Sequence, residues 1–132
     1  MLCWVECVRD EEVLAKVTLV KGVEAVNVTA IVDTGADVSI ISRRLAEKLG
    51  CLIELEEVME VETAKKGVTV RVVGYCIPSR IIFQGERVPL TLLYVAEDLI
   101  EDMIVGRHEI DLWGIVFTKE GPRATRRVLR VV

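Results

Sequence analysis

The chain has 132 residues, of which 52% are hydrophobic and 29% charged, and its formal net charge at pH 7 is −4. This length fits one domain over residues 1–132 and excludes a two-lobed enzyme of ordinary size. No apolar run approaches the ~18–20 residues of a membrane span, and the negative charge gives no overall attraction to nucleic acid. We therefore expect neither a membrane nor a nucleic acid as partner.

The first residues, MLCWVECVRDEEV, lack a basic region followed by a continuous apolar stretch, so they do not resemble a secretory signal and we expect a cytoplasmic location. No Cys-x-x-Cys pair is present, which argues against structural zinc and predicts buried thiols in a reducing compartment for Cys3, Cys7, Cys51 and Cys76. One observation argues against free thiols: the chain has a single Asn and a single Gln. A low content of Asn and Gln is associated with hyperthermophiles, in which intracellular disulfides occur.

Short runs rich in Val, Ile and Thr predict a mostly β domain. Residues 13–20 and 25–32 predict a hairpin joined by KGVE. The segment SRRLAEKLG predicts a short helix with Ser42 as its capping residue and Gly50 as its end. Further strands are predicted over residues 52–55, 58–63, 68–77, 80–83 and 87–95. A second short helix is predicted over residues 107–113, followed by the strand IVF and a last strand, VLRVV.

The stretch AIVDTGADVSIIS, residues 30–42, contains the only residues that indicate chemistry. A strand runs directly into Asp33, and Gly35 allows the backbone to double back in a tight turn. Apolar residues lie on both sides of the turn. This pattern predicts a carboxylate held at the base of a cleft.

Three segments in order, IVDTGADVSIIS, LAEKLG and MIVGRHEIDLWG, resemble the retropepsin family of retroviral-type aspartic proteases over residues 13–117. The resemblance implies a small closed β-barrel of the acid protease type with one or two short helices. It also implies a two-fold homodimer, because each chain supplies one Asp-Thr-Gly loop and the second carboxylate is Asp33 of the partner.

The same resemblance implies an aspartic endopeptidase that acts on peptides or unfolded proteins without a metal or other cofactor. Asp33 matches the catalytic position, and two such carboxylates within a few ångströms share one proton. The ionised Asp33 takes a proton from water, and the protonated one donates to the scissile carbonyl, so no acyl-enzyme forms. Thr34 matches the residue that hydrogen-bonds across the dimer axis, and Gly35 leaves room for substrate.

The resemblance further implies which residues surround the substrate. Ala36 and Asp37 follow the catalytic turn, and Arg107 is expected to form a buried ion pair with Asp37 that supports the loop. The flap that closes over substrate corresponds to residues 61–70, with its tip at Ala64, Lys65, Lys66 and Gly67. These lysines depart from the glycine-rich flaps of viral enzymes.

Other interpretations stay open. A retropepsin-like dimerisation or peptide-binding module without activity is the first alternative, because of the charged flap. The sequence VDTGAD also superficially resembles the phosphate loop of actin-type ATPases, but that fold needs two large lobes. The lone His108 is expected on a helix surface. Both termini are candidates for the dimer interface. The N-terminal candidate is residues 1–12, which include Trp4, and the C-terminal candidate is the alternating segment RRVLRVV.

Overall fold

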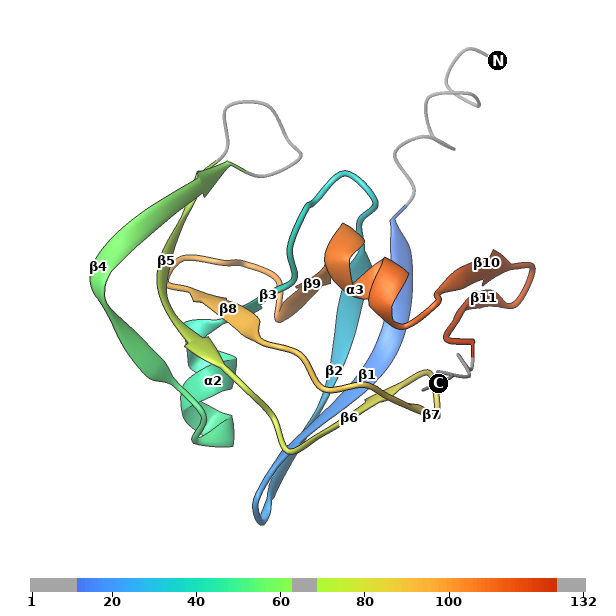
Figure 1. The fold of residues 1–132 in the computed structure, drawn as a ribbon, viewed down its shortest axis with the longest axis horizontal. Coiled ribbons are helices and arrows are strands. Elements are labelled where there is room, and N and C mark those ends of the chain that lie inside the picture. The colour runs from blue at the N-terminus through green and yellow to red at the C-terminus, as the bar shows by residue number, and fades with distance from the viewer. Residues whose placement is uncertain (1–11, 63–68, 126–132) are drawn as a thin grey trace, which may run out of the picture.

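The computed structural model describes residues 12–62 and 69–125 and shows a mostly β protein with two helices in these ranges (Figure 1). The helices are α2 Arg43–Leu49 and α3 Arg107–Leu112. The strands are β1 Val13–Lys21, β2 Glu24–Val32, β3 Ile40–Ser42, β4 Ile53–Glu62, β5 Thr69–Cys76, β6 Arg80–Phe83, β7 Glu86–Val88, β8 Leu93–Ala96, β9 Met103–Val105, β10 Val116–Thr118 and β11 Gly121–Arg123. Trp4, the flap tip and the segment RRVLRVV lie outside the described residues.

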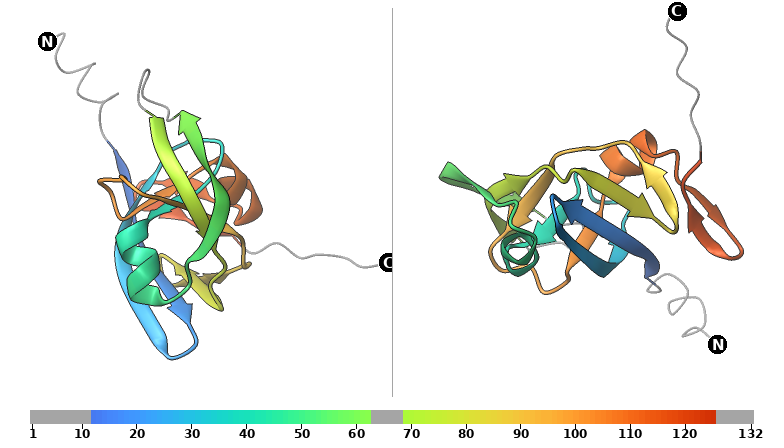
Figure 2. Two further views of the ribbon diagram at one scale, coloured as in Figure 1. Left: turned by 90° about the vertical axis from the view of Figure 1, so that its left-hand side faces the viewer. Right: turned by 90° about the horizontal axis from the view of Figure 1, so that it is seen from below.

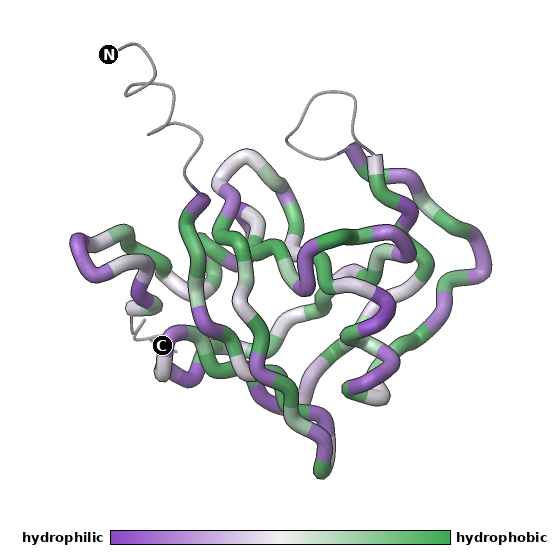
Figure 3. The backbone as a smooth tube through the Cα atoms, turned by 180° about the vertical axis from the view of Figure 1, so that it is seen from behind, coloured by the Kyte–Doolittle hydropathy of each residue, from purple (hydrophilic) through white to green (hydrophobic). Residues whose placement is uncertain are grey.

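The predicted hairpin that leads to the catalytic turn is confirmed. Strands β1 and β2 pair antiparallel from Val13↔Val32 to Lys21↔Glu24, and Gly22 takes a positive φ of 61° in the turn. Hydrophobic and hydrophilic residues alternate along these strands (Figure 3). Each strand therefore directs one face into the core, where Ala15, Val17, Leu19, Val28, Ala30 and Val32 are buried.

Nine of the described strands form one sheet in the order β4-β5-β8-β3-β9-β2-β1-β6-β7, and β10 and β11 form a separate hairpin. Strand β9 pairs parallel with β2 and antiparallel with β3. It thereby brings the start of α3 beside the end of β2. The sequence analysis did not predict β3 or β9.

The closed barrel implied by the family resemblance is not seen in the described residues, where β4 and β7 are the two edges of the large sheet. The sheet is nevertheless strongly curved (Figure 2). Register shifts occur in β4 between Glu54 and Met59 and in β5 between Val72 and Gly74. Such irregularities bend strands and interrupt regular pairing.

Two strand boundaries differ from the sequence prediction. The segments 52–55 and 58–63 were expected as separate strands, but they form the single strand β4 with its register shift. The segment 87–95 was expected as one strand, but it is divided between β7 and β8. Pro89 lies in the division, where its missing N–H cannot support a ladder.

Both helices form close to where the sequence predicts them. Ser42 caps α2 by accepting a hydrogen bond from the Leu45 backbone N–H at 3.1 Å, and Gly50 ends it with a φ of 73°. Trp113 follows α3 and is buried in the core, where its indole N–H donates to the Pro89 carbonyl at 2.9 Å. No helix in residues 12–62 and 69–125 has the length and hydropathy to cross a membrane.

The expectation of free thiols is wrong for two cysteines. Cys51, directly after the α2 cap, and Cys76, at the end of β5, are buried and form a disulfide. The disulfide agrees with the opposing signal from the low Asn and Gln content. It joins the end of α2 to the strand that forms one arm of the predicted flap.

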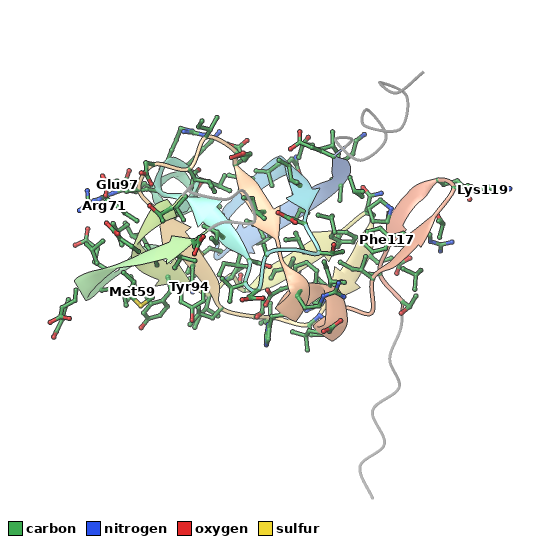
Figure 4. The ribbon with its side chains drawn as sticks, turned by 90° about the horizontal axis from the view of Figure 1, so that it is seen from above. Met59, Arg71, Tyr94, Glu97, Phe117 and Lys119 are labelled. Atoms are coloured by element: carbon green, nitrogen blue, oxygen red, sulfur yellow. A yellow bond between two sulfur atoms is a disulfide. The ribbon has the colours of Figure 1, made fainter. Side chains whose placement is uncertain are left out.

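The second, smaller sheet lies at one end of the molecule, where β11 contacts β1 of the large sheet. The β10–β11 hairpin projects from one end of the molecule, with Lys119 at its tip (Figure 4). Thr118 stabilises the turn by donating from its hydroxyl to the Gly121 carbonyl at 2.8 Å. The Gln84 side-chain amide donates to the Pro122 carbonyl at 3.2 Å and attaches the hairpin to the large sheet.

Candidate active site

The Asp-Thr-Gly turn begins where β2 ends. The Asp33 backbone N–H still donates to the Val105 carbonyl of β9 at 2.9 Å. The Gly35 N–H then donates to Asp33 Oδ1 at 2.9 Å, and the Ala36 N–H donates to the Asp33 carbonyl at 3.1 Å. These bonds orient the carboxylate of Asp33, which is half-buried. Thr34 beside it is exposed.

The start of α3 holds the rest of the loop through main-chain groups. The Arg107 N–H donates to the Ala36 carbonyl at 2.6 Å, and the His108 N–H donates to the Asp37 carbonyl at 3.0 Å. A Cβ atom on Gly106 would lie 2.3 Å from the Val38 carbonyl oxygen. Only glycine therefore fits at this point without moving the loop, a role that the sequence analysis missed.

The expected ion pair between Asp37 and Arg107 is not present, and this expectation was wrong. Arg107 instead lies 3.5 Å from Asp111, one helical turn along α3, and both side chains are largely exposed. Asp37 is also exposed. The loop and the helix are joined at this point by main-chain hydrogen bonds, which do not require an ion pair between Asp37 and Arg107.

Glu109 is the buried charged residue that sequence reasoning missed. Its side chain on α3 is 1% exposed. The Ser39 hydroxyl, which follows the catalytic loop, donates to Oε1 at 2.5 Å. The Thr91 hydroxyl donates to Oε2 at 2.7 Å, and His108 Nδ1 lies 2.6 Å from the same oxygen. His108 itself is exposed, as expected for a helix surface. No local sequence signal identifies such a site, because the hydroxyl groups come from distant segments.

A cavity of about 280 Å³ opens over the catalytic loop. The β2–β3 loop forms one side of it, and the far end of β4 forms another, at the same end of the molecule (Figure 1). Four predicted site residues line the cavity, whereas Thr34 and Arg107 do not. The lining residues are Asp33, Gly35, Ala36, Asp37, Val38, Ile40, Val61, Glu62 and Ile104.

The hairpin predicted as a flap is present up to its last described pair, Glu62↔Thr69. Its predicted tip, Ala64, Lys65, Lys66 and Gly67, lies outside the described residues. Val61 and Glu62, the last described residues of β4 before the predicted tip, line the cavity that contains Asp33. The cavity offers the carboxylates of Asp33, Asp37 and Glu62 for acid–base chemistry. Residues 12–62 and 69–125 contain no cluster of potential metal ligands.

Comparisons with known proteins agree with this geometry. A family described as "gag-polyprotein putative aspartyl protease" matches residues 21–109, about two thirds of the chain. The fold is similar to the retroviral protease-like domain of Ddi1 from Leishmania major, with a TM-score of 0.59 and 21% identity over 83% of this chain and 82% of that one. It is also similar to EIAV protease complexed with the inhibitor HBY-793, with a TM-score of 0.59 and 19% identity over 80% and 90% of the two chains. No curated protein sequence matches the chain.

Proposed function

Because the chain belongs to the retropepsin-like family of aspartyl proteases, we propose that it is a homodimeric aspartic endopeptidase that cleaves peptides or unfolded proteins. The observation that carries the proposal is the position of Asp33. Its carboxylate is oriented by the Gly35 N–H, and Asp33 lines a cavity together with the end of β4. A peptide hydrolase of this kind needs a second carboxylate, and the same turn of a partner chain supplies it.

In the proposed dimer, the two Asp33 carboxyl groups lie together and share one proton, because two negative charges at this distance repel each other. The ionised group takes a proton from a water molecule, and the protonated group donates to the scissile carbonyl oxygen. The water oxygen bonds to the carbonyl carbon and forms a tetrahedral intermediate. Its breakdown, with a proton passed to the leaving nitrogen, gives the two peptides.

Thr34 has a separate place in the proposed dimer. Its side chain is exposed and does not line the cavity of its own chain. We assign to it the hydrogen bond to the partner loop that the family resemblance implies. A hydroxyl at this place would keep the two turns in register.

The main test compares Asp33→Asn with Asp111→Asn as a matched control. Asp111 is exposed on α3 and lies outside the cavity, so the control makes the same chemical change elsewhere. An unstructured protein is incubated with each variant from about pH 3 to 7, with and without a transition-state inhibitor of aspartic proteases. We expect cleavage by the wild type and the control, sensitivity to the inhibitor, and no cleavage by Asp33→Asn. Cleavage by pure Asp33→Asn protein would refute the assignment.

Mixing the wild type with Asp33→Asn tests the dimer. After subunit exchange at equal concentrations, about one quarter of random dimers contain two Asp33 residues, so the activity per total protein falls to about one quarter. A monomeric enzyme would retain half of its activity. A dimer in solution that cleaves nothing would favour the alternative function, a peptide-binding or dimerisation module.

A further inference from the structure

The cavity over the catalytic loop combines an apolar wall with carboxylates. Ile40 on β3 is buried, and three half-buried apolar side chains complete the wall: Val38, Val61 and Ile104. They come from the catalytic loop, the end of β4 and β9. This wall suits the methylene groups of an extended side chain, because contact with it removes apolar surface from water.

Two carboxylates besides Asp33 line the same cavity. Asp37 follows the catalytic turn, and Glu62 lies at the end of β4, so they approach the space from different elements. Both are exposed, and the ion pairs within residues 12–62 and 69–125 involve neither of them. Among the described residues that line the cavity, none is a lysine, arginine or histidine. The described part of the lining therefore contributes a negative potential, which a concave surface with apolar walls strengthens.

Lysine and arginine side chains match this combination, since each has an apolar stem and a cationic head. A purely apolar side chain would displace water from the carboxylates without offering them a hydrogen bond or a positive charge, which costs free energy. An acidic side chain would be repelled. We propose that Glu62, together with Asp37, makes this cavity a subsite for a lysine or arginine side chain close to the scissile bond.

This inference rests on the proposed function, and the dimer gives it a second consequence. Two-fold symmetry places one copy of the cavity on each side of the paired Asp33 residues. Each copy carries its own Glu62 and Asp37. The preferred substrates therefore carry basic residues on both sides of the bond that is cut.

The test uses matched peptides that contain either lysine or norleucine at the positions flanking the scissile bond. Norleucine has an unbranched apolar side chain like the stem of lysine but lacks the ammonium group. The value of kcat/KM is measured for both peptides with the wild type, Glu62→Gln and Glu56→Gln. Glu56 is the control, because it is exposed on β4 but does not line the cavity.

We expect the wild type to prefer lysine by about 1.4- to fivefold, the range for an exposed charge pair. Glu62→Gln should lose most of this preference, whereas Glu56→Gln should keep it. The preference should also weaken as salt is raised from about 0.05 M to 0.5 M, since exposed charges are screened. Equal rates for both peptides, or an unchanged preference in Glu62→Gln, would overturn the inference.

A parallel binding measurement separates this inference from the proposed activity. The same two peptides are made with a reduced, non-cleavable bond, and their Kd values are measured. Cleavage without a lysine preference would leave the protease standing and overturn the subsite. Tighter binding of the lysine peptide by a protein that cleaves nothing would support the subsite and refute the protease. Absence of both binding and cleavage would overturn both.

Discussion

Replacing Glu109 with glutamine is the sharpest test of how the catalytic loop is supported. The Ser39 hydroxyl accepts a hydrogen bond from the Gly106 N–H at 2.9 Å, so its own hydrogen is free to point to Glu109 Oε1. Thr91 and His108 approach the other oxygen. A carboxylate satisfies all of these neighbours. An amide of almost the same shape has one acceptor oxygen, so the group beside its NH₂ must turn to accept a hydrogen bond or lose its own.

The expected loss of unfolding free energy for Glu109→Gln is about 1–3 kcal/mol, the cost of leaving a buried polar group without a partner. The assay is urea unfolding at pH 7, in which the midpoint falls and the m-value stays constant. His108→Ala is the control. Its ring is 63% exposed, so the loss of its contact with Glu109 should cost less than about 1 kcal/mol.

A double-mutant cycle with Ser39→Ala identifies the donor responsible. Once the Ser39 hydroxyl is absent, the amide can face that position without a conflict. The cost of Glu109→Gln should therefore be smaller in the Ser39→Ala background, with a coupling of about 1 kcal/mol. Equal stability of Glu109→Gln and the wild type would refute the reasoning, because it would show that the carboxylate does not hold these groups together.

Three further changes have expected outcomes. Gly106→Ala should lower the unfolding free energy by about 2–3 kcal/mol, because the new Cβ would meet the Val38 backbone carbonyl at 2.3 Å. A crystal structure of the variant in which the loop has not moved would contradict the predicted clash. Replacing both Cys51 and Cys76 by serine should lower the unfolding free energy by about 3–4 kcal/mol, since the disulfide closes a loop with a sequence separation of 25. Equal thermal or urea midpoints for the variant and the non-reduced wild type would contradict this prediction. Arg107→Ala should cost less than about 1 kcal/mol, because its exposed pair with Asp111 is weak. A larger loss would indicate a buried role for this side chain.

The parts of the fold that depend on local signals could be predicted from the sequence. The β1–β2 hairpin follows from two runs of strand-forming residues around a short turn. The ends of α2 follow from Ser42 and Gly50, whose effects act within one helical turn. The placement of Asp33 at a strand end follows from the same hairpin.

Features that depend on distant partners could not be predicted. Strands β3 and β9 have three residues each, too few for a recognisable alternation, and they exist because each lies between two neighbours in the sheet. The pairing of Cys51 with Cys76 depends on the fold that brings them together. Glu109 is buried because Ser39 and Thr91 supply hydroxyl groups from other segments.

The main-chain attachment of the catalytic loop to α3 affects how freely this protein can change. The bonds from the Arg107 and His108 N–H groups are formed by any residue except proline, so these bonds do not depend on the side chains at the two positions. The Arg107 side chain contacts only the exposed Asp111 among the ion pairs of the described residues, whereas the His108 ring contacts Glu109. Gly106 is the restricted position. Directed evolution can therefore randomise position 107 to alter the surface beside the catalytic loop while the catalytic turn keeps its shape.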